Sequence, residues 1–175
     1  MTQPVQFAFV ITMLTVAGCD FAVTEPTLTE PALTVKELEV TMRNVKNETE
    51  ADVQAVVDNA AAADRAIMFI NLDWSVMAHQ IPQFAEFSIE FQKAHPDENV
   101  MFHFVDCTPV THLGYKPLRA LDGWKELEVD GGSLIHGWGE VAWLEHGHVL
   151  HVQRIDEFES TAELIEFTER LMKLD

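Results

Sequence analysis

Two cysteines and eight histidines are the side chains of this 175-residue chain that could most readily act as nucleophiles or metal ligands. Cys19 follows a short apolar run near the N-terminus, whereas Cys107 follows Asp106 at the end of a predicted strand. Two cysteines in such different surroundings do not make a disulfide framework. Thiol chemistry at one site and metal binding by histidines are therefore the first two possibilities to examine.

The segment from Ala66 to Pro82, AIMFINLDWSVMAHQIP, has the layout of a site at the start of a helix. A continuous apolar stretch predicts a buried strand, Asp73 and Trp74 follow it, and a helix with an early proline comes next. This segment resembles the one in which thioredoxin-like proteins carry the motif Trp-Cys-x-x-Cys. Here Ser75 and Ala78 hold the two cysteine places.

The resemblance implies a scaffold without its redox chemistry. Disulfide exchange needs a thiolate stabilised at a helix N-terminus and a second thiol that resolves the mixed disulfide. Ser75 and Ala78 provide neither. The family also has a buried acid six residues before the first cysteine and a cis-proline eight residues before the hairpin glycine. This sequence has Phe69 and Gly139 in those places.

Cys107 is the remaining thiol near that site, because it follows a strand that would end at the active-site edge of the sheet. A single thiol there could form a mixed disulfide or be oxidised. A small, partly buried hydrophobic residue is the simpler interpretation, since no basic side chain adjacent in sequence lowers the pKa of the thiol.

The histidines cluster around a predicted hairpin, where His146 and His148 could share one face of a strand and His151 follows. A metal site needs three or four converging ligands with oriented partners. The sequence has neither an H-E-x-x-H motif nor paired cysteines, and solvated turn and strand-face histidines are the alternative. We therefore predict no cofactor, and these three histidines remain the only metal candidates.

Aromatic residues predict a contact surface. In the family layout Trp74 and Trp138 flank the former redox position, and Trp143 could gather with them. Tryptophan side chains form large apolar contacts in recognition grooves, although core and rim packing is the alternative. The candidate binding residues are Trp74, Ser75, Val76, Met77, His79, Trp138, Gly139 and Glu140.

The net charge of -18, from 29 acidic against 11 basic residues, limits the partners. Such a surface repels the phosphates of nucleic acids and anionic lipid headgroups. It favours solubility, cations or a basic partner, and a merely solvated acidic surface is the alternative.

The N-terminal residues predict export and lipid anchoring. Residues 7–16 form an apolar run about half as long as a membrane-spanning helix, and Val16-Ala17-Gly18-Cys19 follows. This resembles the bacterial lipoprotein signal, whose cysteine is lipidated after cleavage, although no Lys or Arg precedes the run. An ordinary signal peptide and a buried first strand are the alternatives. The resemblance implies a signal peptide over 1–18 and a protein held in the cell envelope by lipid on Cys19, on a bacterial membrane facing the periplasm.

The rest of the chain predicts a tether followed by one α/β domain. Repeated Thr-Glu-Pro over 20–34 is typical of an extended linker. In 35–45 the spacing of Val35, Leu38 and Met42 suits a helix, whereas 39–42 alternates like a strand; we favour a strand or mixed segment and assign 19–48 to a tether and lead-in. Residues 49–175 are assigned to a thioredoxin-like domain, a three-layer α/β/α sandwich with a central mixed sheet. The expected elements are helices over 51–63, 76–94, 118–127 and from 161 on, with strands over 67–72, 100–105, 140–145 and 148–154.

The resulting functional hypothesis is a membrane-tethered, redox-inactive thioredoxin-like module that binds or scaffolds an unknown protein or peptide. A thiol-disulfide oxidoreductase or thiol sensor that uses Cys107 is one alternative. A metal-binding domain that uses the hairpin histidines is another.

Overall fold

The computed structural model describes residues 33–73, 80–129 and 132–174. The predicted signal peptide, Cys19 and most of the tether lie outside the described residues. So do Trp74, Ser75, Val76, Met77, Ala78 and His79.

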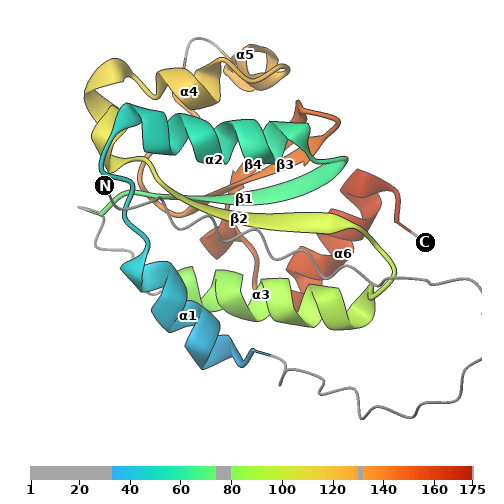
Figure 1. Cartoon of the computed structure of the whole chain (residues 1–175). Coiled ribbons are helices and arrows are strands. Elements are labelled where there is room, and N and C mark those ends of the chain that lie inside the picture. The colour runs from blue at the N-terminus through green and yellow to red at the C-terminus, as the bar shows by residue number, and fades with distance from the viewer. Residues whose placement is uncertain (1–32, 74–79, 130–131, 175) are drawn as a thin grey trace, which may run out of the picture.

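A four-stranded mixed sheet forms the centre of the domain (Figure 1). Its strands lie in the order β2-β1-β3-β4. The parallel pair consists of β1 (Arg65–Asn71) and β2 (Val100–Asp106), and the antiparallel hairpin consists of β3 (Glu140–Glu145) and β4 (His148–Arg154). Because β3 runs antiparallel to β1, the sheet has both strand orientations, as the sequence predicts.

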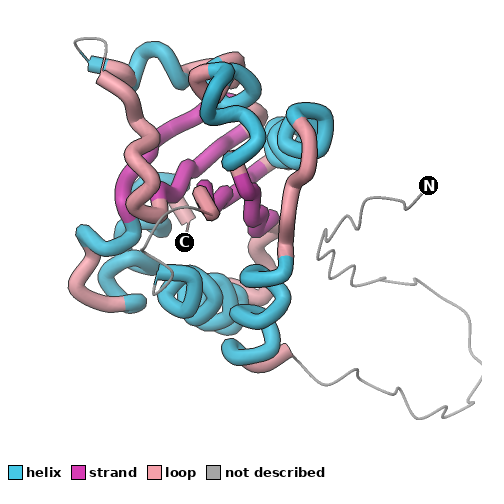
Figure 2. Tube along the Cα trace, turned by 90° about the vertical axis from the view of Figure 1, so that its left-hand side faces the viewer, coloured by secondary structure: helices cyan, strands magenta, loops and turns pink. Residues whose placement is uncertain are grey.

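Helices cover both faces of this sheet (Figures 1 and 2). One face carries α2 (Glu50–Ala62) together with the short helices α4 (Lys116–Arg119) and α5 (Trp124–Leu127). The other carries α1 (Val35–Asn44), α3 (Gln80–Ala94) and α6 (Thr161–Met172). Two 3-10 helices, η1 (Thr108–Leu113) and η3 (Ile155–Glu157), follow β2 and β4. This arrangement is a thioredoxin-like α/β/α sandwich.

The sheet separates two hydrophobic cores, because side chains alternate between the faces of a strand. On β1, Met68 and Ile70 pack with the α2 side, whereas Ile67 and Phe69 pack with the α3 and α6 side. Phe69 contacts Phe84 of α3 with ring centroids 5.0 Å apart. The position where the family has a buried acid is thus filled by an aromatic side chain that joins a helix to the sheet.

The prediction of a strand or mixed segment over 35–45 is wrong, since this segment is helix α1. Thr34 and Glu37 form a capping box that satisfies the first-turn N–H groups of the helix. Leu38 and Met42 lie on the face that packs into the core beside α3. The apparent alternation arose because Val40 is apolar although half of its surface is exposed.

The expected helix over 118–127 is instead divided into α4 and α5. Gly123 separates them with a φ of 78°, in the left-handed region that favours glycine. A Cβ there would lie 2.7 Å from the carbonyl oxygen of Val149, so the backbone of this loop can approach β4 only with glycine. The hairpin itself is confirmed at its predicted bounds.

His103 is a buried polar residue on β2, on the sheet face that α2 covers. Its Nε2 atom has no hydrogen-bond partner in the described part of the chain, and burial lowers the pKa of the side chain to about 4. The folded protein therefore keeps this imidazole neutral at a pH where an unfolded chain would already protonate it.

This difference predicts that the domain loses stability as the pH falls from 6.5 to 4. The unfolded state binds a proton at His103 first, so its free energy drops relative to the folded state by about 3 kcal/mol over that interval. Urea unfolding of the wild type and of His103→Leu across this pH range measures the effect. The two curves should diverge toward low pH, and parallel curves would contradict the assignment.

Candidate functional site

The carboxyl ends of β1 and β2 meet the start of β3 at one edge of the sheet. Asn71 pairs with Asp106 across the parallel strands, and Ile70 pairs with Glu140 across the antiparallel ones. Asp106 and Glu140 are both buried there although they carry carboxylates. This edge is where the sequence places its candidate site.

Cys107 lies at this edge with no exposed surface. Its backbone N–H donates to the carbonyl oxygen of Asn71 at 2.8 Å, and its side chain belongs to the core under α2. Burial raises the pKa of the thiol, and the negative charges of Asp106 and Glu140 raise it further. The thiol therefore stays protonated at neutral pH, which is the opposite of what a nucleophilic cysteine requires.

The Asp106 carboxylate has a structural role. Its Oδ1 atom accepts hydrogen bonds from the N–H of Thr108 at 3.1 Å and from its hydroxyl at 2.6 Å. The backbone N–H of Asp106 donates to the side-chain oxygen of Asn47 at 2.8 Å, and the Thr108 hydroxyl accepts from the N–H of Asp73. These bonds tie the segment before α2, the end of β1 and the start of η1 together.

Glu140 organises the loop that precedes β3. Its Oε1 atom accepts the backbone N–H groups of His136 at 2.9 Å and of Trp138 at 3.2 Å, which compensates the burial of the carboxylate. The flanking residues Gly137 and Gly139 have φ angles of 78° and 76°. Gly139 holds the family's cis-proline place, and no described residue has a cis peptide bond. The loop thus acquires its shape from two left-handed glycines around a buried carboxylate.

Trp138 points outward from this loop, with 41% of its surface exposed. The guanidinium carbon of Arg154 lies 4.3 Å from the centroid of its ring, a cation–π contact that orients the indole. Hydrogen bonds to Asp156, 2.6 and 2.9 Å long, raise the pKa of Arg154. The exposed tryptophan is therefore held in place before any partner binds.

Gln80 is the other unusual residue beside the loop. It opens α3, is 1% exposed, and has no hydrogen-bond partner among the described residues at either its side-chain oxygen or its nitrogen. A Cβ on Gly139 would overlap its side-chain oxygen, so the Gln80 amide lies directly against the loop backbone. No local pattern marks this residue in the sequence, since a glutamine before Ile81 and Pro82 is ordinary in a first helical turn.

Trp143 does not join this surface, so that part of the aromatic prediction is wrong. Its indole N–H donates to the Thr168 hydroxyl at 3.0 Å, and its ring packs against Phe158 and Phe167. Trp143 is fully buried between the sheet and α6. Trp143 lies on β3, where the alternation of side chains directs it into the core, whereas Trp138 lies in the loop before that strand.

The hairpin histidines have three different partners. His148 Nδ1 lies 2.7 Å from the carboxylate of Asp122, and His146 Nδ1 lies 3.8 Å from that of Asp64. His151 interacts with Gln153 and packs its ring near Trp143. Among the described residues, no three His, Cys, Asp or Glu side chains are grouped so that they could hold a metal ion.

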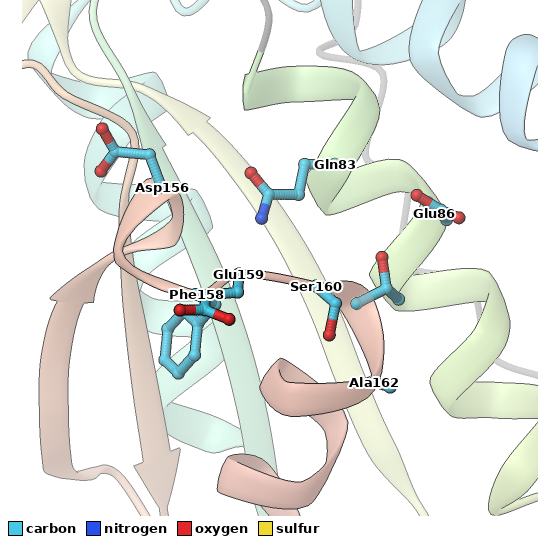
Figure 3. Close-up of a pocket in the computed structure, with 8 residues that line it drawn as sticks. Gln83, Glu86, Asp156, Phe158, Glu159, Ser160 and Ala162 are labelled. Carbon is cyan, nitrogen blue, oxygen red and sulfur yellow. The ribbon is translucent and has the colours of Figure 1, made fainter.

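A shallow pocket of about 630 Å³ lies between α3 and the segment from η3 to the start of α6 (Figure 3). No local sequence pattern indicates this pocket, because its residues come from two segments that are far apart in the chain, 83–86 and 156–162. Three of the lining side chains are acidic, and Phe158 is the buried apolar one. The lining residues are Gln83, Glu86, Asp156, Phe158, Glu159, Ser160, Thr161 and Ala162.

Within the described part of the chain, we find no helix whose length and apolar character would let it cross a membrane.

The unpartnered amide of Gln80 predicts an unusual stability change. Gln80→Met should raise the free energy of unfolding by about 1 kcal/mol, because it removes two buried polar atoms without hydrogen bonds and preserves volume. Gln83→Met is the matched control three residues along α3. Gln83 donates to the Ile155 carbonyl oxygen at 3.1 Å, so its replacement should lower stability. Chemical denaturation measures both, and a loss of stability in Gln80→Met would contradict the assignment.

Comparisons with known proteins give structural likeness only. No protein-family model and no curated protein sequence matches the chain. Among solved structures, zinc-bound human ERp44 is 18% identical with a TM-score of 0.48, over 70% of this chain and 29% of that one. The first two thioredoxin domains of Saccharomyces cerevisiae Eps1p are 13% identical with a TM-score of 0.47, over 72% and 40%. The first thioredoxin domain of mouse protein disulfide-isomerase A4 is 12% identical with a TM-score of 0.41, over 84% and 89%. The chain thus spans well under half the length of the first two.

Proposed function

We propose that this protein is a redox-inactive thioredoxin-like module that binds a protein or peptide through the loop carrying Trp138. One observation carries the proposal. Cys107, the only cysteine among the described residues, is fully buried beside two carboxylates, while the same end of the sheet presents an exposed, oriented tryptophan. The site is therefore better suited to contact than to thiolate chemistry.

The contact region comprises Trp138, Gly139 and Glu140 together with the segment from Trp74 to His79. Trp138 provides the apolar contact. Glu140 is buried and holds the loop in shape by accepting its backbone N–H groups. A preorganised aromatic side chain loses little conformational entropy on binding, which favours affinity. Trp74 to His79 are included on the sequence resemblance alone.

The geometry favours neither the thiol oxidoreductase or sensor nor the metal-binding domain. A thiol sensor needs an accessible thiol with a lowered pKa, whereas burial raises that of Cys107. A metal-binding domain needs converging ligands, whereas His146, His148 and His151 have separate partners.

Insulin reduction with dithiothreitol tests the absence of redox activity. The unaltered chain should not accelerate insulin precipitation, because its Cys107 thiol is buried and protonated and no second thiol lies in the motif. Ser75→Cys combined with Ala78→Cys should gain activity, since it restores the dithiol that the scaffold is expected to support. Turnover by the unaltered chain that disappears in Cys107→Ser would overturn the proposal.

Membrane tethering through Cys19 is a further part of the proposal, supported by the lipoprotein-like residues 16–19 and the Thr-Glu-Pro segment. Expressed in a bacterium, the chain should partition into the detergent phase of Triton X-114, and Cys19→Ser should move it to the aqueous phase. The same change at Cys107 is the control and should leave partitioning unaltered. Aqueous partitioning of the unaltered chain would contradict the anchor.

A further inference from the structure

A continuous surface extends from Trp138 to the acidic pocket. Arg154 stacks on the Trp138 ring and pairs with Asp156, which itself lines the pocket. The N–H of Ile155 donates to the Gly139 carbonyl oxygen at 3.0 Å, which fixes the loop against η3. We call this the Trp138 surface, formed by Trp138, Gly139, Arg154 and the pocket residues.

The acidic residues that line the pocket make it suited to a long, positively charged side chain. Phe158 lines the pocket but is only 7% exposed, because its ring packs against Trp143 and Phe167 in the core. The carboxylates of Glu86 and Glu159 are exposed, and neither forms an ion pair within the described part of the chain. The positive end of the α6 dipole lies at this pocket and is offset in part by Glu163, whose carboxylate accepts the N–H of Glu159 and whose own N–H donates to Ser160. The pocket therefore offers two carboxylates to a cation.

Gln80 gives an independent indication that a ligand binds beside the loop. A buried amide without partners costs stability, and here it lies against the backbone of Gly139. A peptide group carries one donor and one acceptor, which are the two partners that this amide lacks. A bound main chain that takes the place of the Gly139 backbone over Gln80 would supply both partners, in exchange for the Ile155–Gly139 hydrogen bond that closes the loop there.

We propose that the Trp138 surface binds an extended peptide segment in which lysine or arginine alternates with apolar residues. This proposal rests on the proposed binding function and names its partner class. An apolar side chain of the segment packs on Trp138, a basic one enters the pocket toward Glu86 and Glu159, and the main chain bonds to Gln80. The net charge of -18 attracts such a segment and repels an acidic one.

Fluorescence anisotropy with two labelled peptides tests the proposal on the full chain. The first probe is Gly-Ser-Lys-Leu-Lys-Leu-Lys-Ser-Gly, and the second replaces each lysine with glutamate. The lysine peptide should bind, with affinity that falls as salt is added, and the glutamate peptide should not. Absence of binding by the lysine peptide, or equal binding by both, would overturn the proposal.

Matched charge removal separates the pocket from the general acidic field. Glu86→Gln with Glu159→Gln should weaken binding of the lysine peptide by about fivefold, the effect of losing two exposed ion pairs. Glu50→Gln with Glu126→Gln neutralises two exposed carboxylates on other helices, so each double variant raises the net charge from -18 to -16. The control pair should change affinity less than twofold. Equal weakening by both pairs would mean that the overall negative charge attracts the peptide, and it would overturn the assignment of the pocket as the binding site.

Two further variants test the other contacts. Trp138→Ala should also weaken binding, and Gln80→Met should weaken it while raising stability, a combination that a merely structural glutamine would not produce. Unchanged affinity in both variants would overturn the role of the loop. These results test only the peptide partner. The proposed redox-inactive function is tested separately, because insulin turnover that requires Cys107 would overturn it even if the lysine peptide binds.

Discussion

The buried carboxylate of Glu140 is the constraint on which the rest of the site depends. An ionised carboxylate is costly inside a protein unless hydrogen bonds compensate it, and here the N–H groups of His136 and Trp138 do so. Those bonds curl the loop before β3 around the carboxylate. The curled loop points the Trp138 ring toward Arg154, and its carbonyl at Gly139 accepts from η3. One charge thus orients the exposed side chain and anchors the neighbouring segments.

The same charge also acts on the neighbouring cysteine. Glu140 and Asp106 both raise the pKa of Cys107, in addition to the effect of burial. A redox site would need the reverse, a positive potential that stabilises a thiolate. The electrostatic feature that shapes the loop before β3 therefore opposes thiolate formation at Cys107.

The sequence predicts those parts of the fold that local rules determine. The hairpin follows from His146-Gly147, where φ angles of 51° and 78° suit a two-residue turn, and α2 follows from its Thr49–Asp52 cap. Helix α1 is not predicted correctly, because an apolar Val40 on its exposed face produces a strand-like alternation. Trp143, Gln80 and the acidic pocket depend on which distant segments meet, and local patterns carry no such information. The resemblance located the Trp138 loop, but the buried acid at its base comes from β3 and not from the position of Phe69.

Charge balance around the Trp138 surface decides which partner it suits. Arg154 is the cation nearest to the indole, yet Asp156 holds it bidentately and Glu157 lies 3.8 Å from it. Its guanidinium orients the ring and leaves no excess positive charge for an acidic ligand. Glu86 and Glu159 lie beyond it at the pocket, and the chain as a whole is strongly negative. Because Asp156 and Glu157 already balance Arg154, an apolar side chain on the tryptophan and a basic side chain in the acidic pocket would suit one and the same partner.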